Sequence, residues 1–317
     1  MSAARGRVLV GARELAGLVG ESTGDRGSTA QGADRRPLVL DVRWALGVTD
    51  GRDRYLAGHV PGAVYVDLES ELAAPASPAA GRHPLPPPAH LQAAARRWGV
   101  RSDRAVVVYD AVGGTSAARA WWLLRWAGHH DARILDGGLG AWERAGLPVE
   151  TGDVRAEPGD VVVAPGAMPV LAADDAARVA ASDADVLLDA RAAERYRGEV
   201  EPVDPRAGHV PGAVSAPTTD NLAGDGTFLD EDALRARFVA LGVTTGAGTG
   251  AGAAAGSTTP TAAGATVGVY CGSGVTAAHE VAALATLGVE AALYAGSWSQ
   301  WSNDPDRPVA TGAAPPG

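Results

Sequence analysis

Short apolar runs alternate along this chain with longer stretches of helical periodicity. The runs are rich in β-branched residues and lie at 38–41, 106–109, 186–189 and 267–270. Between them, segments such as 117–127 and 277–287 repeat apolar residues at helical spacing. Strands that are apolar on both faces and separated by helices are typical of a parallel sheet covered on both sides. The pattern predicts an α/β fold.

The same pattern occurs twice. Residues 57–63 read Ala-Gly-His-Val-Pro-Gly-Ala and recur at 207–213, and the strand-end pair Asp41 and Arg43 recurs as Asp189 and Arg191. Such an internal repeat indicates a duplicated unit. The histidine before each Val-Pro-Gly turn is therefore expected to have a shared structural role.

The repeat predicts two domains. We place a first domain at 7–150, a linker at 151–166 that contains Pro158 and Pro165, and a second domain at 167–312. A tract rich in Gly, Ala, Thr and Ser at 246–264 is expected to be a flexible insertion in the second domain, and 21–36 a polar insertion in the first. The length of 317 residues suits two such cores.

Charge and composition exclude several classes of function. Lys and Arg total 27 against 37 acidic residues, and the resulting net charge of -10 disfavours nucleic acid or an anionic membrane as a partner. The sequence contains no lysine, which excludes a Schiff-base lysine and a phosphate-loop lysine.

A single cysteine limits the chemistry further. One thiol forms neither an internal disulfide nor a multi-thiolate metal site, so we expect no metal and a reducing compartment. Residues 1–20 lack the apolar stretch of a signal peptide, and no apolar run reaches the ~20 residues of a membrane span. We therefore expect a cytoplasmic protein without a membrane partner.

That cysteine, Cys271, directly follows the predicted strand 267–270. Residues 272–276 (Gly-Ser-Gly-Val-Thr) come next, and then a predicted helix. The glycines allow backbone N–H groups to converge on one point, and the helix dipole adds positive charge there. We expect this loop to favour a nucleophilic thiolate at its lip.

The alternative is that a lone cysteine is a small buried apolar residue. Asp110 holds the corresponding position in the first copy, so only one copy carries the nucleophile.

On these segments the chain, from Val8 to Val309, resembles the tandem rhodanese-type sulfurtransferases. The loop Cys-Gly-Ser-Gly-Val-Thr-Ala at 271–277 is similar to that of the 3-mercaptopyruvate sulfurtransferases, as are the paired Gly-His-Val-Pro-Gly-Ala segments and Gly-Ser-Trp at 296–298. The resemblance implies two rhodanese-like domains, each a mostly parallel sheet flanked by helices. Relatives that use thiosulfate commonly carry cationic residues in this loop, and here there are none.

The resemblance also implies a set of site residues from both domains. They are Cys271 as the sulfur-carrying nucleophile, Ser273 as its assisting hydroxyl, Gly272, Ser273, Gly274, Val275 and Thr276 as the cradle of the persulfide, Arg195 and Arg206 as the substrate-binding arginines, and Glu69 and His83 as contributors from the first domain. A planar guanidinium binds a carboxylate through two parallel hydrogen bonds, which suits the two arginines. The alternatives are that both arginines form surface ion pairs and that His83 is an ordinary loop histidine.

The implied activity is transfer of sulfur from 3-mercaptopyruvate through a Cys271 persulfide, with release of pyruvate and no cofactor. The acceptor would be a thioredoxin-like protein, a low-molecular-weight thiol or cyanide. Three alternatives stay open: a thiosulfate sulfurtransferase of the same fold, a non-catalytic sulfur-carrier or redox module, and a cysteine phosphatase. The last is disfavoured because Ala277 stands where a phosphatase loop has its phosphate-binding arginine.

Overall fold

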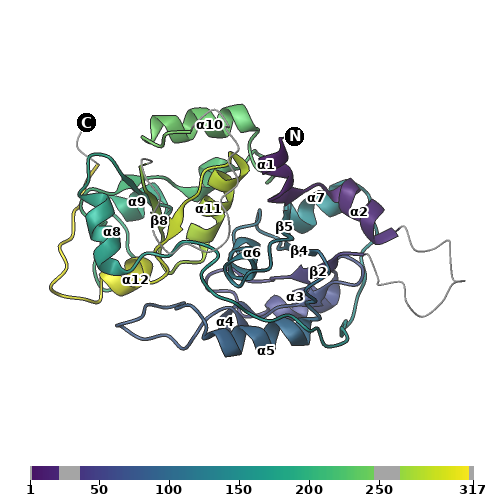
Figure 1. Cartoon of the computed structure of the whole chain (residues 1–317). Helices are drawn as coiled ribbons and strands as arrows, with labels where there is room; N and C mark the ends of the chain where they lie inside the picture. Colours follow the sequence, from purple (N-terminus) through teal and green to yellow (C-terminus); the bar gives the residue numbers. More distant parts are fainter. Residues whose placement is uncertain (1, 21–35, 246–264, 314–317) are drawn as a thin grey trace, which may run out of the picture.

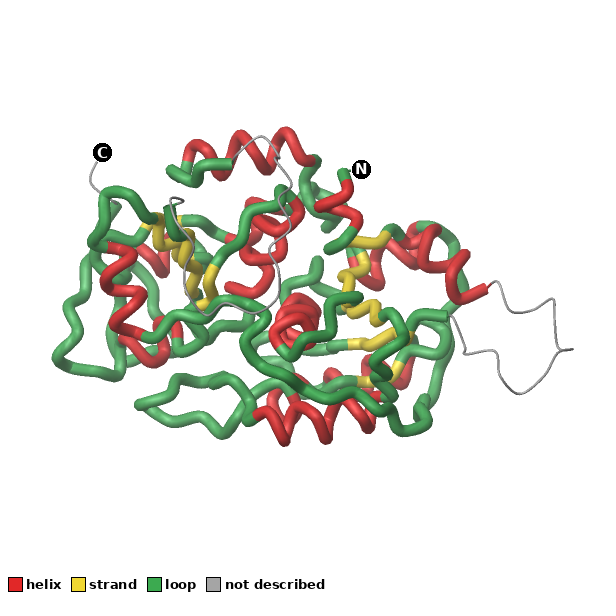
Figure 2. Tube along the Cα trace, viewed as in Figure 1, coloured by secondary structure: helices red, strands yellow, loops and turns green. Residues whose placement is uncertain are grey.

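The computed structural model describes residues 2–20, 36–245 and 265–313. Two α/β units lie side by side, and the strands of each are enclosed by helices (Figures 1 and 2). The segment expected to be the linker runs back over the first unit, where Gly159 N–H donates to Arg96 O and Ala164 N–H donates to Ala127 O. The tract expected to be an insertion at 246–264 and residues 21–35 lie outside the described residues.

The first unit is built on a parallel five-stranded sheet of order β1-β5-β4-β2-β3. Alternate strand residues face opposite layers, with Leu38 packing among residues of α5 and α6 and Val39 among residues of α2 and α7. Both faces are therefore buried. The elements of this unit are β1 (Leu9–Val10), β2 (Leu38–Asp41), β3 (Val64–Tyr65), β4 (Val106–Tyr109), β5 (Ala132–Leu135), α1 (Ala3–Gly6), α2 (Ala12–Gly20), α3 (Gly51–Ala57), α4 (Leu68–Glu71), α5 (Pro88–Trp98), α6 (Ala117–Trp126) and α7 (Gly138–Arg144).

The second unit repeats this plan with a parallel sheet of order β7-β6-β8-β9. Val269 packs with residues of α10 and α11 on one face of the sheet, and Leu187 packs with residues of α8 and α12 on the other. The elements are β6 (Val186–Asp189), β7 (Val214–Ser215), β8 (Val267–Tyr270), β9 (Ala292–Leu293), α8 (Ala173–Ala180), α9 (Ala193–Tyr196), the 3-10 helix η1 (Thr218–Asn221), α10 (Glu231–Ala240), α11 (Thr276–Thr286) and α12 (Ser297–Trp301).

The four apolar runs of the sequence are β2, β4, β6 and β8, with the same bounds as predicted. The predicted helices 117–127 and 277–287 are α6 and α11, each within one residue at its ends. The prediction of two α/β units with parallel sheets is therefore confirmed.

The two units share one interface, formed largely by α6 and α11, which pack against each other. His279 of α11 crosses it, because its Nε2 lies 3.2 Å from the Gly113 carbonyl oxygen of the first unit. The N-terminal helix α1 also lies between the units (Figure 1), where Arg5 donates to Leu229 O at 2.7 Å and pairs with Asp136 at 3.2 Å. This interface brings together the loops that follow β4 and β8.

The repeated histidines have matching structural contacts. His59 Nδ1 lies 2.9 Å from Tyr55 O, and His209 Nδ1 lies 2.7 Å from Tyr196 O. Each ring also stacks on that tyrosine, with centroids 4.2 Å and 3.7 Å apart. Each histidine therefore joins its Val-Pro-Gly turn to a preceding helix, α3 in the first unit and α9 in the second, which agrees with a shared structural role.

Asp110 occupies the loop after β4, where the second unit has Cys271. Its side chain is fully buried and accepts four backbone N–H groups at 2.8–2.9 Å, those of residues 112, 114, 116 and 117. Burial raises the pKa of Asp110, and these donors oppose the increase. The loop of the first unit thus holds a carboxylate of its own chain in place of an external anion.

Asp110→Asn is expected to lower the free energy of unfolding by about 2–4 kcal/mol, because the amide NH2 would face N–H donors and leave two of them without acceptors. Urea unfolding followed by tryptophan fluorescence measures this, since six of the eight tryptophans lie in the first unit. Asp103→Asn, at an exposed ion pair with Arg101, is the matched control and should change the free energy of unfolding far less than Asp110→Asn does. Equal effects of both variants would contradict the role of Asp110.

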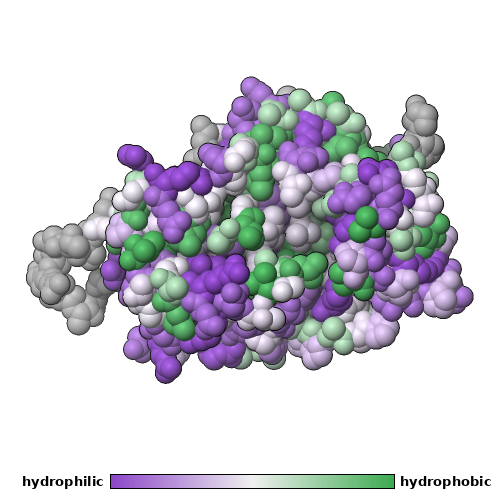
Figure 3. All heavy atoms as spheres, turned by 180° about the vertical axis from the view of Figure 1, so that it is seen from behind, coloured by the Kyte–Doolittle hydropathy of each residue, from purple (hydrophilic) through white to green (hydrophobic). Residues whose placement is uncertain are grey.

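The surface is mixed. On the face drawn in Figure 3, hydrophobic areas are small and separated by hydrophilic ones. Within the described residues, none of the helices combines the length and apolar character needed to cross a membrane.

Candidate active site

Cys271 lies between β8 and α11, at the carboxyl edge of the second sheet. Its side chain is 1% exposed and forms part of the floor of a cavity of about 380 Å³. The thiol therefore lies deeper than the loop lip where we expected it. Residues of both units line the cavity: Trp44, Arg82, Val112 and Ser116 from the first, and Arg191, Arg195, Thr218 and Cys271 from the second.

The Cys271 loop is shaped by one glycine and by the segment after β9. Gly274 has a φ of +79°, and a Cβ there would lie 2.5 Å from the Ala295 carbonyl oxygen, so only glycine fits. Its N–H donates to Cys271 Sγ at 3.1 Å. The carbonyl of Cys271 accepts from Trp298 N–H at 2.9 Å. The Gly-Ser-Trp segment thus fixes the loop that presents the thiol.

Three side chains from the two units form a hydrogen-bonded chain beside this loop, which we call the Glu69–His83–Ser273 relay. Ser273 Oγ lies 2.7 Å from His83 Nδ1, and His83 Nε2 lies 3.1 Å from Glu69 Oε2. The Glu69 carboxylate accepts a hydrogen bond from His83 Nε2–H, so Nδ1 of the neutral ring is the acceptor of the Ser273 hydroxyl. Trp44 Nε1–H holds Glu69 at 2.7 Å. Burial lowers the pKa of His83, and Glu69 opposes the decrease.

Arg119 of α6 is a fully buried cation at the back of the loop. All its described acceptors are main-chain carbonyls, among them Gly274 O at 3.2 Å and His83 O at 2.9 Å. Burial lowers the pKa of Arg119 to about 10, and negative charge on Cys271 opposes the decrease. One guanidinium therefore joins the His83 segment to the Cys271 loop and adds positive charge near the sulfur.

The two predicted substrate arginines lie in different places. Arg195 of α9 lines the cavity and pairs with Glu201 at 2.6 Å. Arg206 is absent from the cavity lining, and its guanidinium donates to the carbonyls of residues 301, 302, 304 and 307. With all these donors engaged in holding the segment after α12, Arg206 has a structural position, and we do not include it in the substrate site.

Three residues of the site were missed by the sequence reasoning: Trp44, Arg82 and Arg119. The one available signal was for Arg119, which interrupts the apolar pattern of the predicted helix 117–127. Trp44 and Arg82 lie in loops whose paths a periodic pattern does not define. Arg82 reaches the cavity from the first unit and pairs with Asp204.

Comparison with known proteins agrees with this geometry. The rhodanese-like domain family matches two ranges of the chain, residues 28–145 and 172–304. The chain belongs to the rhodanese family. The predicted tandem of rhodanese-like domains is thereby confirmed, and both matched ranges lie within the domains expected from the repeat.

This tandem rhodanese has relatives over most of its length. It is 47% identical to SseB of Mycobacterium tuberculosis (strain H37Rv), provisionally named a thiosulfate sulfurtransferase, over 98% of this chain and 99% of that protein. It is 46% identical to a Pseudomonas aeruginosa protein provisionally named a 3-mercaptopyruvate sulfurtransferase, over 87% and 92%. The crystal structure of the 3-mercaptopyruvate sulfurtransferase SseA from Escherichia coli matches with a TM-score of 0.73 at 34% identity, over 92% and 98%.

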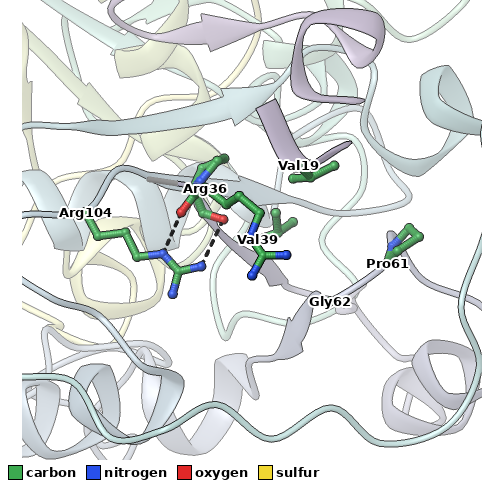
Figure 4. Close-up of a pocket in the computed structure, with 7 residues that line it drawn as sticks. Val19, Arg36, Val39, Pro61, Gly62 and Arg104 are labelled. Atoms are coloured by element: carbon green, nitrogen blue, oxygen red, sulfur yellow. Dashed lines mark hydrogen bonds between the residues drawn. The ribbon is translucent and has the colours of Figure 1, made fainter. Parts of the chain in front are cut away.

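The protein has a second cavity, of about 330 Å³, in its first unit (Figure 4). Arg36 and Arg104 line it, and Arg104 Nε–H donates to Arg36 O at 2.7 Å. It shares no lining residue with the Cys271 cavity. Among the described residues, no group of three or more His, Cys, Asp or Glu side chains is arranged to hold a metal ion.

Proposed function

We propose that this protein is a sulfurtransferase that takes sulfur from 3-mercaptopyruvate onto Cys271, releases pyruvate and passes the sulfur to a thiol or to cyanide. The observation that carries the proposal is the Ser273 hydroxyl, which lies two residues from the nucleophile and 2.7 Å from a histidine of the other domain. Such a relay suits a donor whose leaving group needs a proton.

The first step moves one sulfur and one proton. The Cys271 thiolate attacks the substrate sulfur, an S–S bond forms and the C–S bond breaks, with the electron pair passing to the carbon as the pyruvate enolate. The substrate thiol loses its proton to the Ser273–His83 pair, which returns it to the enolate carbon to give pyruvate. The thiolate and the mercaptopyruvate anion are thus converted into a Cys271 persulfide anion and the pyruvate anion, with no change in total charge.

Backbone and buried charge then stabilise the persulfide. The Gly274 N–H already donates to Sγ, and the positive charge of Arg119 lies behind the loop. Because these dipoles and charges are fixed before the reaction, they need no reorganisation as the anion forms. In the second step an acceptor thiolate attacks the outer sulfur, forms a new persulfide and restores the Cys271 thiolate.

Thiosulfate is the second candidate donor, as the name of the Mycobacterium tuberculosis relative indicates. Two features favour mercaptopyruvate. The sulfite released from thiosulfate is stable as an anion and does not need the relay. Each guanidinium that lines the cavity has a carboxylate partner, namely Asp204 for Arg82, Asp189 for Arg191 and Glu201 for Arg195, which suits a monoanion better than a dianion.

We expect kcat/KM for 3-mercaptopyruvate to exceed that for thiosulfate by at least about 100-fold. Steady-state assays of both donors, with cyanide as the common acceptor, measure pyruvate or sulfite release together with thiocyanate. A higher kcat/KM for thiosulfate would overturn the choice of donor. Sulfur loading without repeated turnover on any acceptor would instead favour the carrier module, and hydrolysis of an aryl phosphate would favour the phosphatase.

We propose the acceptor and the location from the same chemistry. A buried persulfide at the floor of a cavity suits a thioredoxin-like protein with a projecting thiol, or a small thiol, as the acceptor. The single cysteine has no partner for a disulfide, which is consistent with a cytoplasmic protein, and the proposed transfer needs no cofactor.

A further inference from the structure

Two arginines from different domains converge beside the nucleophile. Arg82 comes from the loop between α4 and α5, and Arg195 comes from α9. A Cβ on Gly272 would lie 3.0 Å from Arg82 Nη2 and 3.3 Å from Arg195 Nη1. Both guanidinium groups therefore lie next to the residue that follows Cys271, and both line the cavity above the thiol.

One carboxylate joins the two cations. Asp204 pairs with Arg82 through Oδ1 and with Arg195 through Oδ2, the latter at 3.3 Å, and its side chain is only 3% exposed. Asp204 engages Arg82 Nη1 and Arg195 Nη2 and thereby holds the two guanidiniums at a spacing that fits the two oxygens of a carboxylate, with Arg82 Nη2 and Arg195 Nη1 on the side of Gly272. The Nε–H groups of Arg82 and Arg195 are also buried without a hydrogen-bond acceptor, which leaves donors available beside the cavity.

We infer that Arg82 is a substrate-binding residue of the first domain, which together with Arg195 binds the carboxylate and keto oxygens of an α-keto acid sulfur donor. The inference rests on the proposed function, and it assigns to Arg82 the place expected of Arg206. A donor with this head group would contact both domains at once, with its sulfur directed toward Cys271.

Charge strengthens the inference. Arg191 and Arg195 face three carboxylates, those of Asp189, Glu201 and Asp204, so Arg82 is the cation that brings this cluster to neutrality. Without Arg82, an incoming carboxylate would meet an excess negative charge as well as the loss of a donor. Substitutions at Arg82 and Asp204 separate the effect of net charge from the loss of the hydrogen-bond donor.

The test compares Arg82→Met, Asp204→Asn and the double variant, with pyruvate release from 3-mercaptopyruvate and product inhibition by pyruvate as readouts. Arg82→Met should lower kcat/KM about 100-fold, mainly through KM, and raise the pyruvate inhibition constant similarly. Asp204→Asn keeps both arginines and removes one negative charge from the cluster, so it should lower KM and raise kcat/KM. The double variant should remain at least about 10-fold below Asp204→Asn.

Recovery of the double variant to the wild-type kcat/KM would overturn the inference, since Arg82 would then only neutralise Asp204. Wild-type behaviour of Arg82→Met would overturn it as well. Discharge of the loaded persulfide by dithiothreitol involves no carboxylate, so a rate within about threefold of the wild type in Arg82→Met shows an intact loop and supports a role in donor binding. A large loss of discharge would overturn that role. Failure of the wild type to release pyruvate would overturn the proposed function itself.

Discussion

Cys271→Ser is expected to abolish both sulfur loading and pyruvate release, with a loss in turnover of at least about 10³-fold. A serine hydroxyl of similar size keeps the loop but is not ionised near neutral pH, so the N–H of Gly274 and the charge of Arg119 have no anion to stabilise. Intact-mass spectrometry after exposure to 3-mercaptopyruvate measures loading, because the wild type should gain one sulfur atom and the variant none.

The single cysteine makes the result unambiguous. Alkylation of the wild type with iodoacetamide modifies no other thiol and should reproduce the loss irreversibly. After sulfur loading, the alkyl group goes onto the outer sulfur instead, so dithiothreitol should cleave the resulting disulfide, return the Cys271 thiol and restore activity. Ser302→Ala is the control for a change of hydroxyl content outside the cavity, because Ser302 lies directly after α12 and does not line the cavity. Turnover of Cys271→Ser above the uncatalysed rate would remove the thiol from the mechanism.

The fold was predictable because its strands are simple to recognise. The β2, β4, β6 and β8 segments are short runs of mostly apolar, β-branched residues that are buried on both faces, so the hydrophobic pattern alone located them. Recognition of β8 also identified Cys271 as a site candidate, because a parallel sheet brings the residues that follow its strands to one edge. The two-residue strands β1, β3, β7 and β9 carry too little pattern to be recognised.

The sequence alone does not show which arginine side chains reach the cavity. Arg206 and Arg195 are both near α9 in the sequence, yet Arg206 donates to carbonyls after α12 while Arg195 lines the cavity. The direction of each of these side chains depends on tertiary contacts, which leave no periodic pattern in the sequence. Arg82 reaches the cavity only because the domain interface brings a proline-rich loop of the first unit to the second, a long-range arrangement that no local pattern encodes.

Glu69 and His83 were assigned by resemblance, and the structure brings them to Ser273 although 190 residues separate His83 from that serine. Their catalytic roles stay predictions. The contact between Arg119 and the His83 carbonyl explains how the loop is held there, since a buried guanidinium on α6 needs carbonyl acceptors and the proline-rich loop supplies them.

Removal of the relay is expected to slow the first half-reaction far more than the second. Ser273→Ala and His83→Gln should each lower the rate of pyruvate release about 10²-fold, because the enolate then lacks a positioned proton, while transfer of sulfur from the loaded enzyme to dithiothreitol should change by less than about threefold. Single-turnover experiments separate the two steps. His130→Gln, at an exposed position outside the cavity, is the matched control and should leave both rates unchanged.

The pH dependence gives the relay a sharper signature. Its resting form needs an unprotonated Nδ1 on His83, and burial lowers the pKa of this histidine below the ordinary value of 6.5. As pH falls through that lowered value the ring gains a proton, Nδ1 becomes a donor that faces the Ser273 hydroxyl, and pyruvate release should slow. The acid limb of kcat/KM should therefore lie below pH 6.5 in the wild type and be absent from His83→Gln. An acid limb that persists in this variant would assign the titration to another group and leave His83 without a part in proton transfer.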